Sequence, residues 1–194
     1  MSISLSKGQT LSLAKNNPGL SRVFMGLGWD PVKKKGLFGG LLGGGGGAID
    51  LDASVIVFDA ERNEIDTVFF RNLQSADGAI KHDGDNRTGD GDGDDEVIHV
   101  DLSRLNPLAA HLVFTVNSFQ GQTFNEVDNS VARLVDETTG REICSFTLKE
   151  QGAHTGVIMA SLSKGVDGWT MMAHGKPATG RTVKDLASIS KTVI

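Results

Sequence analysis

The sequence holds a single cysteine, Cys144, so it can form neither an internal disulfide nor a zinc site built from cysteines. Its first residues, MSISLSKGQT, lack the apolar stretch of a signal peptide, and no run of about 18 apolar residues is present to span a bilayer. The net charge of -5 argues against a general nucleic-acid binder, which carries a basic excess. These absences predict a protein of the reducing cytoplasm with no transmembrane segment and no nucleic-acid partner.

Motifs of catalysis are also missing. The five histidines are scattered, and no G-x-S-x-G nucleophile motif accompanies them. Gly43, Gly45 and Ala48 fit a dinucleotide-binding pattern, but only as part of a polyglycine run with no helix after it. One cysteine cannot supply the thiol pair of a reductase. We therefore expect a protein that is not an enzyme.

Short runs rich in β-branched and aromatic residues are separated by turn residues along the whole chain. They predict strands at 3–5, 10–13, 20–27, 51–58, 66–71, 96–102, 111–118, 130–135, 143–148, 155–162 and 168–174. The segments between them are too short for crossover helices. The pattern predicts an all-β fold, a two-sheet β-sandwich that forms a single domain over residues 1–194. One short helix is predicted at the C-terminus, from about Val183 to Thr192, with Thr182 as its N-cap.

A low-complexity insert interrupts this pattern at residues 33–47, which read KKKGLFGGLLGGGGG. Eight glycines in fifteen residues give the backbone a large conformational entropy, so we predict a mobile loop. Its three lysines and four apolar side chains also permit contact with an anionic membrane surface.

The most informative segment is the acidic loop at residues 83–96, DGDNRTGDGDGDDE. Seven of its fourteen residues are Asp or Glu and one is Arg, which gives a local charge of -6. Asp90, Asp92 and Asp94 alternate with glycines, so the loop can fold tightly and turn many carboxylates inward. Two like charges about 5 Å apart repel by roughly 3 kcal/mol at an effective dielectric of 20. This loop is therefore predicted to bind cations, and two ions neutralise it better than one.

The ligand chemistry favours Ca²⁺, which takes six to eight oxygen ligands, over zinc or copper, which recruit His or Cys. Magnesium keeps more of its waters and needs fewer carboxylates. The loop is not an EF-hand, because Asp95 stands where glycine is required and Asp101 where glutamate is required. Further ligands can come from Asp50 and Asp52, which share one face of a predicted strand, and from Asp30. An ordinary turn or edge aspartate is the alternative for each of these three.

Several segments together resemble the TerD family of tellurite-resistance and stress-response proteins over nearly the whole chain. They are SLSKGQTLSLAK, MGLGWD, IDLDAS, GDNRTGDGDGDDE, DLSRL, FTVNSFQGQTFNEV and VDETTGREI. The segment WDPVKKKGLFGG is similar to the TerZ-like members of that family. The resemblance implies a β-sandwich that binds two Ca²⁺ ions.

Carried over position by position, the resemblance implies one ligand set. It comprises Asp30, Asp50, Asp52, Asp85, Asn86, Asp90, Asp92, Asp94, Asp95 and Glu96. Asp83 stands where relatives often carry Ser or Thr and is left out. Asp90 replaces a common glutamate, which shortens that ligand arm.

These observations favour a calcium-dependent scaffold that works with other stress-response proteins. One alternative is an adaptor at the inner membrane surface that uses the 33–47 insert. The other is a calcium-assisted enzyme acting on a phosphate, which would keep an open coordination position beside a pocket.

Overall fold

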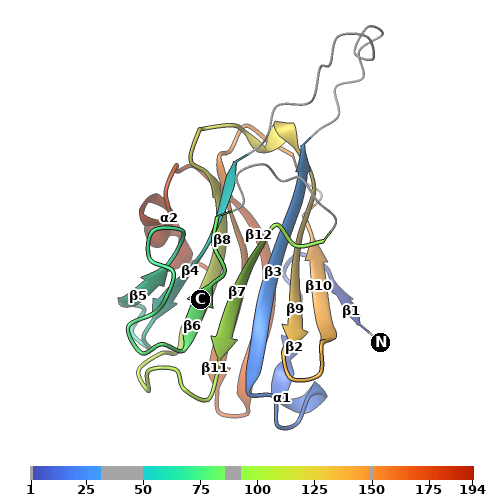
Figure 1. Cartoon of the computed structure of the whole chain (residues 1–194), viewed down its shortest axis with the longest axis vertical. Coiled ribbons are helices and arrows are strands. Elements are labelled where there is room, and N and C mark those ends of the chain that lie inside the picture. The colour runs from blue at the N-terminus through green and yellow to red at the C-terminus, as the bar shows by residue number, and fades with distance from the viewer. Residues whose placement is uncertain (1, 32–49, 86–92, 149–150) are drawn as a thin grey trace, which may run out of the picture.

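The computed structural model describes residues 2–31, 50–85, 93–148 and 151–194. Two six-stranded sheets lie face to face, with one short helix on the outside (Figure 1). The prediction of a two-sheet β-sandwich with a short C-terminal helix is confirmed. The predicted mobile insert at 33–47 lies outside the described residues.

The first sheet, sheet A, has the order β1-β10-β9-β3-β7-β6. Its strands are β1 (Ile3–Leu5), β3 (Arg22–Pro31), β6 (Ile80–His82), β7 (Glu96–Asp101), β9 (Val127–Asp136) and β10 (Arg141–Thr147). All neighbours are antiparallel except β1 and β10, which are parallel.

The second sheet, sheet B, has the order β2-β12-β11-β8-β4-β5 and is antiparallel throughout. Its strands are β2 (Thr10–Ser12), β4 (Leu51–Phe58), β5 (Glu64–Val68), β8 (His111–Ser118), β11 (Gly156–Gly165) and β12 (Gly168–Ala178). The β11–β12 turn contains only Val166 and Asp167, because Gly165 pairs with Gly168. Neither turn residue has a positive φ, but Gly168, which follows them, takes a φ of 100°, a conformation that favours glycine.

The core lies between the sheets and is built from alternate strand positions. In β4, Leu51, Val55 and Val57 point into it, while Ile56 and Phe58 point to the outer face. There α2 (Val183–Ser190) covers them with Val183 and Leu186, among other residues. This second apolar layer explains why the second half of β4, residues 55–58, is a continuous hydrophobic run in the sequence.

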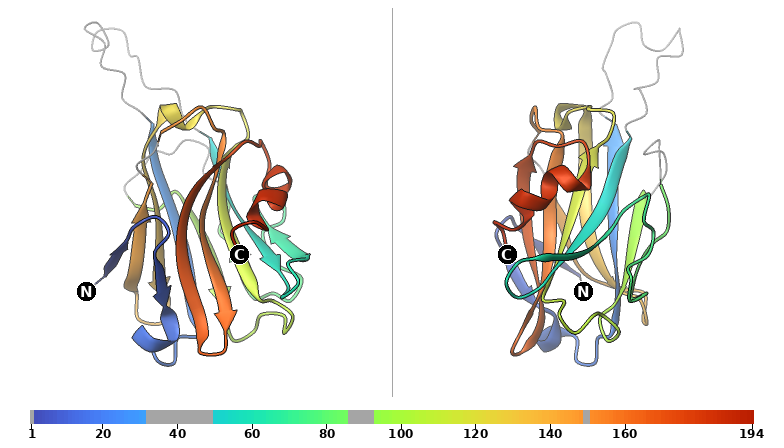
Figure 2. Two further views of the ribbon diagram at one scale, coloured as in Figure 1. Left: turned by 180° about the vertical axis from the view of Figure 1, so that it is seen from behind. Right: turned by 90° about the vertical axis from the view of Figure 1, so that its left-hand side faces the viewer.

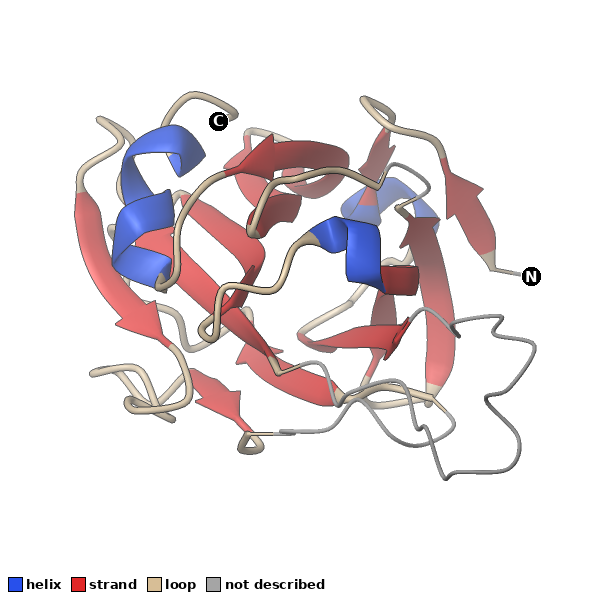
Figure 3. Cartoon of the chain, turned by 90° about the horizontal axis from the view of Figure 1, so that it is seen from above, coloured by secondary structure: helices blue, strands red, loops and turns tan. Residues whose placement is uncertain are grey.

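The two sides of the sandwich differ. Edge strands β1 and β2 lie on one side, and β5, β6 and α2 lie on the other (Figure 2). The view from above shows α2 outside the layer of strands (Figure 3). β5 pairs only with Val55–Phe58 and leaves the beginning of β4 uncovered on that edge.

Three short elements were not predicted. They are β6, the four-residue α1 (Leu13–Asn16) and the 3-10 turn η1 (Phe124–Glu126). Leu13 was expected at the end of a strand, but Ser12 accepts a hydrogen bond from the Lys15 backbone N–H and thereby caps a helical turn. The predicted C-terminal helix is present and ends at Ser190.

Candidate metal centre

Three aspartates from the two sheets meet at the uncovered edge of β4. Asp50 precedes β4, Asp52 is its second residue, and Asp85 follows β6 at the edge of sheet A. One carboxylate oxygen from each lies within 4.8 Å of the others. The acidic pattern had suggested all three residues, and this group could hold a metal ion.

The two β4 carboxylates of this acidic triad are buried. Asp50 is 8% exposed; its Oδ2 accepts a hydrogen bond of 3.0 Å from Gln120 Nε2, while its Oδ1 is buried and has no hydrogen-bond partner among the described residues. Asp52 is 4% exposed and has a long contact of 3.5 Å from Asn117 Nδ2. A buried carboxylate oxygen without a donor is costly, and a bound cation removes that cost.

The electrostatics of Asp52 point the same way. Burial, followed by the negative charges of Glu96, Asp50 and Asp85, raises the pKa of Asp52 to about 7. The nearby His82 opposes this only in part. Without a cation, Asp52 is therefore not fully ionised at neutral pH. A divalent ion would favour its ionised form and lower its pKa.

Glu96 lies beside the triad, and one of its carboxylate oxygens contacts groups of the protein itself. It is 1% exposed, and its Oε2 accepts a hydrogen bond of 2.7 Å from the Ala53 backbone N–H. His82 Nε2 lies 3.2 Å from that same carboxylate oxygen and 3.2 Å from the Ala53 carbonyl oxygen. His82 Nδ1 accepts from Gly84 N–H at 3.0 Å, so both ring nitrogens face protein partners. Glu96 and His82 thus tie sheet A to the β4 backbone beneath Asp52.

Asp95 and Asp30 form a second acidic group at the end of β3. The Trp29 backbone N–H donates to Asp95 Oδ2 at 2.8 Å, and Asn129 Nδ2 donates to Asp30 Oδ2 at 2.8 Å. Burial raises the pKa of Asp95 in spite of the bond from Trp29, and the charge of Asp30 raises it further.

Asp94 points elsewhere. Its carboxylate accepts two hydrogen bonds from Arg133, from Nε at 2.6 Å and from Nη2 at 2.7 Å. The pair lies over Gly26, where a Cβ would overlap the carboxylate. Because the flanking Ala132 and Leu134 belong to the core, Arg133 lies on the opposite, outer face of sheet A. Within the described residues Asp94 is not gathered with the triad, and its role as a ligand remains a prediction.

The other acidic residues divide into two sets. Asn86, Asp90 and Asp92 lie outside the described residues. Asp83, which the family pattern left out, lies 2.9 Å from His99 Nε2, and His99 Nδ1 lies 2.8 Å from Glu137. Asp83 therefore belongs to a surface ion-pair group and not to the triad.

Two polar residues near the triad were missed in the sequence. Asn117 is paired with Asp52 in the β4–β8 register, and Gln120 reaches Asp50 from the loop after β8. A weak signal for Asn117 was present, because it follows the largely apolar run LVFTV in the strand HLVFTVNS. No local pattern could show that this strand lies beside β4.

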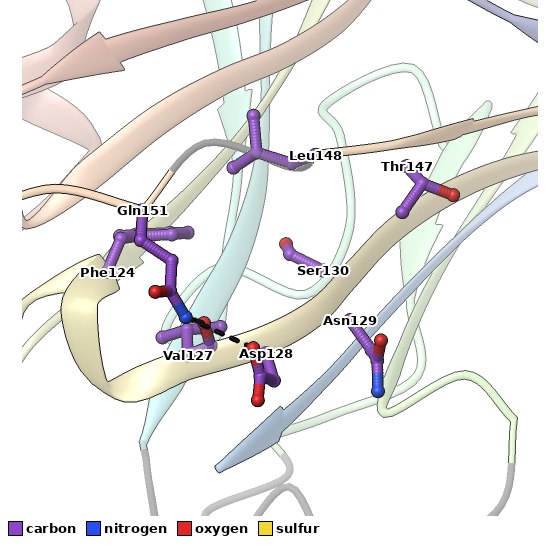
Figure 4. A pocket seen from close by; sticks show the side chains of 8 residues that line it. All are labelled: Phe124, Val127, Asp128, Asn129, Ser130, Thr147, Leu148 and Gln151. Atoms are coloured by element: carbon purple, nitrogen blue, oxygen red, sulfur yellow. Dashed lines mark hydrogen bonds between the residues drawn. The ribbon is translucent and has the colours of Figure 1, made fainter. Parts of the chain in front are cut away.

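A separate hollow of about 440 Å³ lies near the start of β9 (Figure 4). Gln151 donates to the Val127 carbonyl at 3.0 Å and to Asp128 at 3.1 Å within it. Among the described lining residues no buried side-chain atom lacks a partner. The hollow gives no sign of a missing ligand.

Comparison with known proteins assigns the chain to a family. The model of the TerD domain matches residues 1–189. The chain belongs to the TerD family. It is 52% identical to the tellurium resistance protein TerZ of Serratia marcescens over 96% of this chain and 95% of that protein. It is 38% identical to the stress response protein SCP2 of Bacillus subtilis over 97% and 98% of the two chains.

A solved structure gives the same fold. The homologue of telluride resistance protein TerD from Streptomyces coelicolor A3(2) superposes with a TM-score of 0.68 at 24% identity, covering 87% of this chain and 96% of that one. The family model and the relatives confirm the resemblance read from the sequence, including its TerZ-like character. Within the described residues, no helix has the length and apolar character needed to cross a membrane.

Proposed function

We propose that this TerD-family protein is a calcium-binding, non-enzymatic module of a tellurite-resistance and general stress-response system. The observation that supports it most strongly is the buried, unpartnered Oδ1 of Asp50 beside Asp52 and Asp85. Carboxylate oxygens gathered at this density, with a buried acceptor still open, provide a site for a hard cation.

The donor set favours calcium. All three residues of the triad offer oxygen atoms, the type of ligand that Ca²⁺ takes. His82 is the imidazole near the triad, and both of its ring nitrogens contact protein groups. It therefore does not present a free nitrogen ligand of the kind that zinc recruits. We propose two ions per chain, one held by the triad and one by residues of the acidic loop together with the Asp30 and Asp95 group.

The proposed role is structural and regulatory. The triad joins β4 of sheet B to the segment that follows β6 of sheet A. An ion there would link Asp52 to Asp85, which is 33 residues further along the chain. Binding would fix the open edge of the sandwich, and that edge would then be available to a partner. We propose other stress-response proteins as partners, in the cytoplasm. The membrane contact predicted for residues 33–47 concerns a segment outside the described residues.

Native mass spectrometry tests the ion count and identity. Chelator-stripped protein dialysed against equal concentrations of Ca²⁺, Mg²⁺ and Zn²⁺ should carry two calcium ions. The Asp50→Asn variant should lose the ion of the triad, while Asp83→Asn, an acidic neighbour outside it, should keep both. A protein that carries no calcium, or that prefers zinc, would contradict the proposal.

A further inference from the structure

A hollow of about 290 Å³ adjoins the triad on the outer face of sheet B. Asp52 lies in its wall, so the pocket and the candidate metal centre share a residue. Ser54 of β4 and Asn117 of β8 also line it. The remaining walls come from the segment after β5, the loop after β8 and the first turn of α2, which lies beside β4 and β8 (Figure 1). Its volume is near the lower end of the range for small-molecule sites.

Aromatic rings and cations line this pocket together. Phe69, Phe70 and Phe119 are among its walls, and the rings of Phe70 and Phe119 meet edge to face with centroids 6.0 Å apart. The Arg71 guanidinium lies 5.1 Å from the Phe70 centroid and 5.8 Å from that of Phe119. Lys184 adds a second positive charge.

The local backbone holds these groups in place. Phe69 and Asn72 exchange two backbone hydrogen bonds, of 3.0 and 2.8 Å, so Phe70 and Arg71 occupy the tip of a closed turn. Arg181 Nε donates to the Phe119 carbonyl at 3.1 Å and fixes the loop after β8. No ion pair with a carboxylate occupies Arg71 among the described residues. Its charge is therefore available to a ligand.

One buried polar atom in the wall lacks a partner. Asn117 is 1% exposed; its Nδ2 donates to the Arg181 carbonyl at 2.9 Å, but its Oδ1 accepts no hydrogen bond among the described residues. Buried acceptors are nearly always paired. An N–H or O–H group of a ligand, or a water held by it, would complete this one.

We propose that the pocket binds a small planar anion, an aromatic ring that carries a carboxylate or phosphate group, next to the bound metal ion. The ring would pack against the phenylalanines, and the oxyanion would face Arg71 and Lys184. The coupling to metal rests on the proposed calcium site: without a cation the carboxylate of Asp52 repels the anion, and with one it does not. Phe119 and Gln120 are consecutive, so the loop that shapes the pocket also holds Asp50.

The test uses the full-length protein at saturating calcium, titrated calorimetrically with phenyl phosphate and with benzoate; inorganic phosphate and benzyl alcohol serve as the two halves of the ligand. A planar anion should bind more tightly than either half. Arg71→Gln should weaken that binding about tenfold or more, since a hydrogen bond to a charged group contributes about 1.5–3 kcal/mol. Phe119→Ala should weaken it as well. Arg22→Gln, which removes an exposed arginine from sheet A, should leave it unchanged.

Calcium titrations of the same samples separate this inference from the proposed function. Arg71→Gln should bind calcium as the wild type does, and chelation should weaken binding of the planar anion. Calcium binding without any binding of phenyl phosphate or benzoate, or equal binding by Arg71→Gln and wild type, would overturn the pocket assignment alone. Binding of the planar anion that is identical with and without calcium would refute the shared role of Asp52. If the wild type binds the planar anion but no calcium, the proposed function is overturned. The pocket assignment is then decided by whether Arg71→Gln weakens binding of the planar anion.

Discussion

The burial of Asp52 has two opposite effects, one without a bound cation and one with it. Its carboxylate is buried at the start of β4 beside Asp50 and Glu96, which raises its pKa to about 7 and makes the unliganded site unfavourable. The same burial makes it a strong ligand once a cation is present, because the ion is then screened little by water.

This conflict predicts opposite effects of one substitution. Asp52→Asn should stabilise the chelator-treated protein at neutral pH by about 1–3 kcal/mol, because it removes a buried charge from a repulsive group. It should also weaken calcium binding. Urea unfolding with and without chelator measures the first effect. Asp83→Asn, whose carboxylate is half exposed and paired with His99, should change neither quantity much. A variant of Asp52 that is less stable in chelator would contradict the repulsion argument.

A second residue gives a pH dependence far from the acidic loop. His174 is 7% exposed, and its Nε2 lies 2.9 Å from Ser161 Oγ. Burial, with a smaller effect of Lys176, lowers the pKa of His174 to about 4. Between pH 6.5 and 4 the unfolded chain binds a proton that the folded chain does not, so this residue lowers stability as the pH falls.

The His174→Gln variant should accordingly lose less stability than the wild type between pH 6.5 and 4. Melting curves recorded in chelator across that range measure the slope, and the absolute stability of the variant does not affect the comparison. Val166→Ala, an exposed change in the β11–β12 turn that removes no titratable group, is the control. Parallel slopes for wild type and His174→Gln would show that His174 is not buried as a neutral imidazole.

At the residue scale the sequence predicted three residues that the structure brings together in the candidate site. The spacing of Asp50 and Asp52 in a strand pattern correctly placed both on one face, and these residues lie with Asp85. The partners Asn117 and Gln120 could not be found, because their proximity depends on the pairing of β4 with β8, some 60 residues apart. The ion pair of Asp94 with Arg133 is hidden for the same reason.

Among the elements, β3 shows how a small residue makes room for the acidic loop. Gly26 is paired with Arg133 in β9, and the Asp94 carboxylate lies above it. A side chain at position 26 would displace that carboxylate from its two hydrogen bonds to Arg133. The C-terminal end of the loop is thereby pinned to the outer face of sheet A.

Gly26→Ala should therefore destabilise the protein by about 1–3 kcal/mol, mainly through loss of the Asp94–Arg133 pair. Chemical denaturation in calcium measures it. In Gly165→Ala the added Cβ meets only an ordinary contact of 3.7 Å with the Gly168 carbonyl, so this change should be nearly neutral. A double-mutant cycle tests the cause. If Gly26→Ala lowers the unfolding free energy as much in the Arg133→Gln background as in the wild type, its cost does not come from the Asp94–Arg133 pair and this explanation is wrong.

Longer strands were predicted well, and short elements were not. β6 has three residues, one of them charged, and becomes a strand only because β7 pairs with it. β12 was expected to end near residue 174 but continues through Pro177. β2 pairs only with Thr170–Met172, so the far part of β12 has a neighbouring strand on one side only. Proline is tolerated there because no strand on the other side needs a hydrogen bond from its backbone nitrogen.

In the whole molecule, the triad lies on the side of the sandwich where β5 and β6 form the edges of the two sheets. β5 and β6 are the edge strands on this side, and the carboxylates come from both sheets. A cation bound here acts as a link between the sheets, in addition to the shared apolar core. Its loss should open this edge before the rest of the sandwich.

Chelation should lower the melting temperature by about 5–10 °C for each ion removed, since each site contributes about 2.7 kcal/mol at a hundredfold excess of ion over its dissociation constant. Hydrogen exchange should rise first at Asp50–Ser54 and at β6. The β11–β12 hairpin serves as an internal reference that should stay protected. Unchanged melting and exchange after chelation would mean that the ion has no structural role.

Calorimetric titration of chelator-stripped protein with Ca²⁺ tests the central claim most directly, with wild type and Asp52→Asn run side by side. The account predicts binding of two ions by the wild type, with dissociation constants of about 10⁻⁷ to 10⁻⁵ M, and at least a tenfold loss at one site in Asp52→Asn. An absence of heat, binding only in the millimolar range, or equal affinities for the two proteins would contradict it.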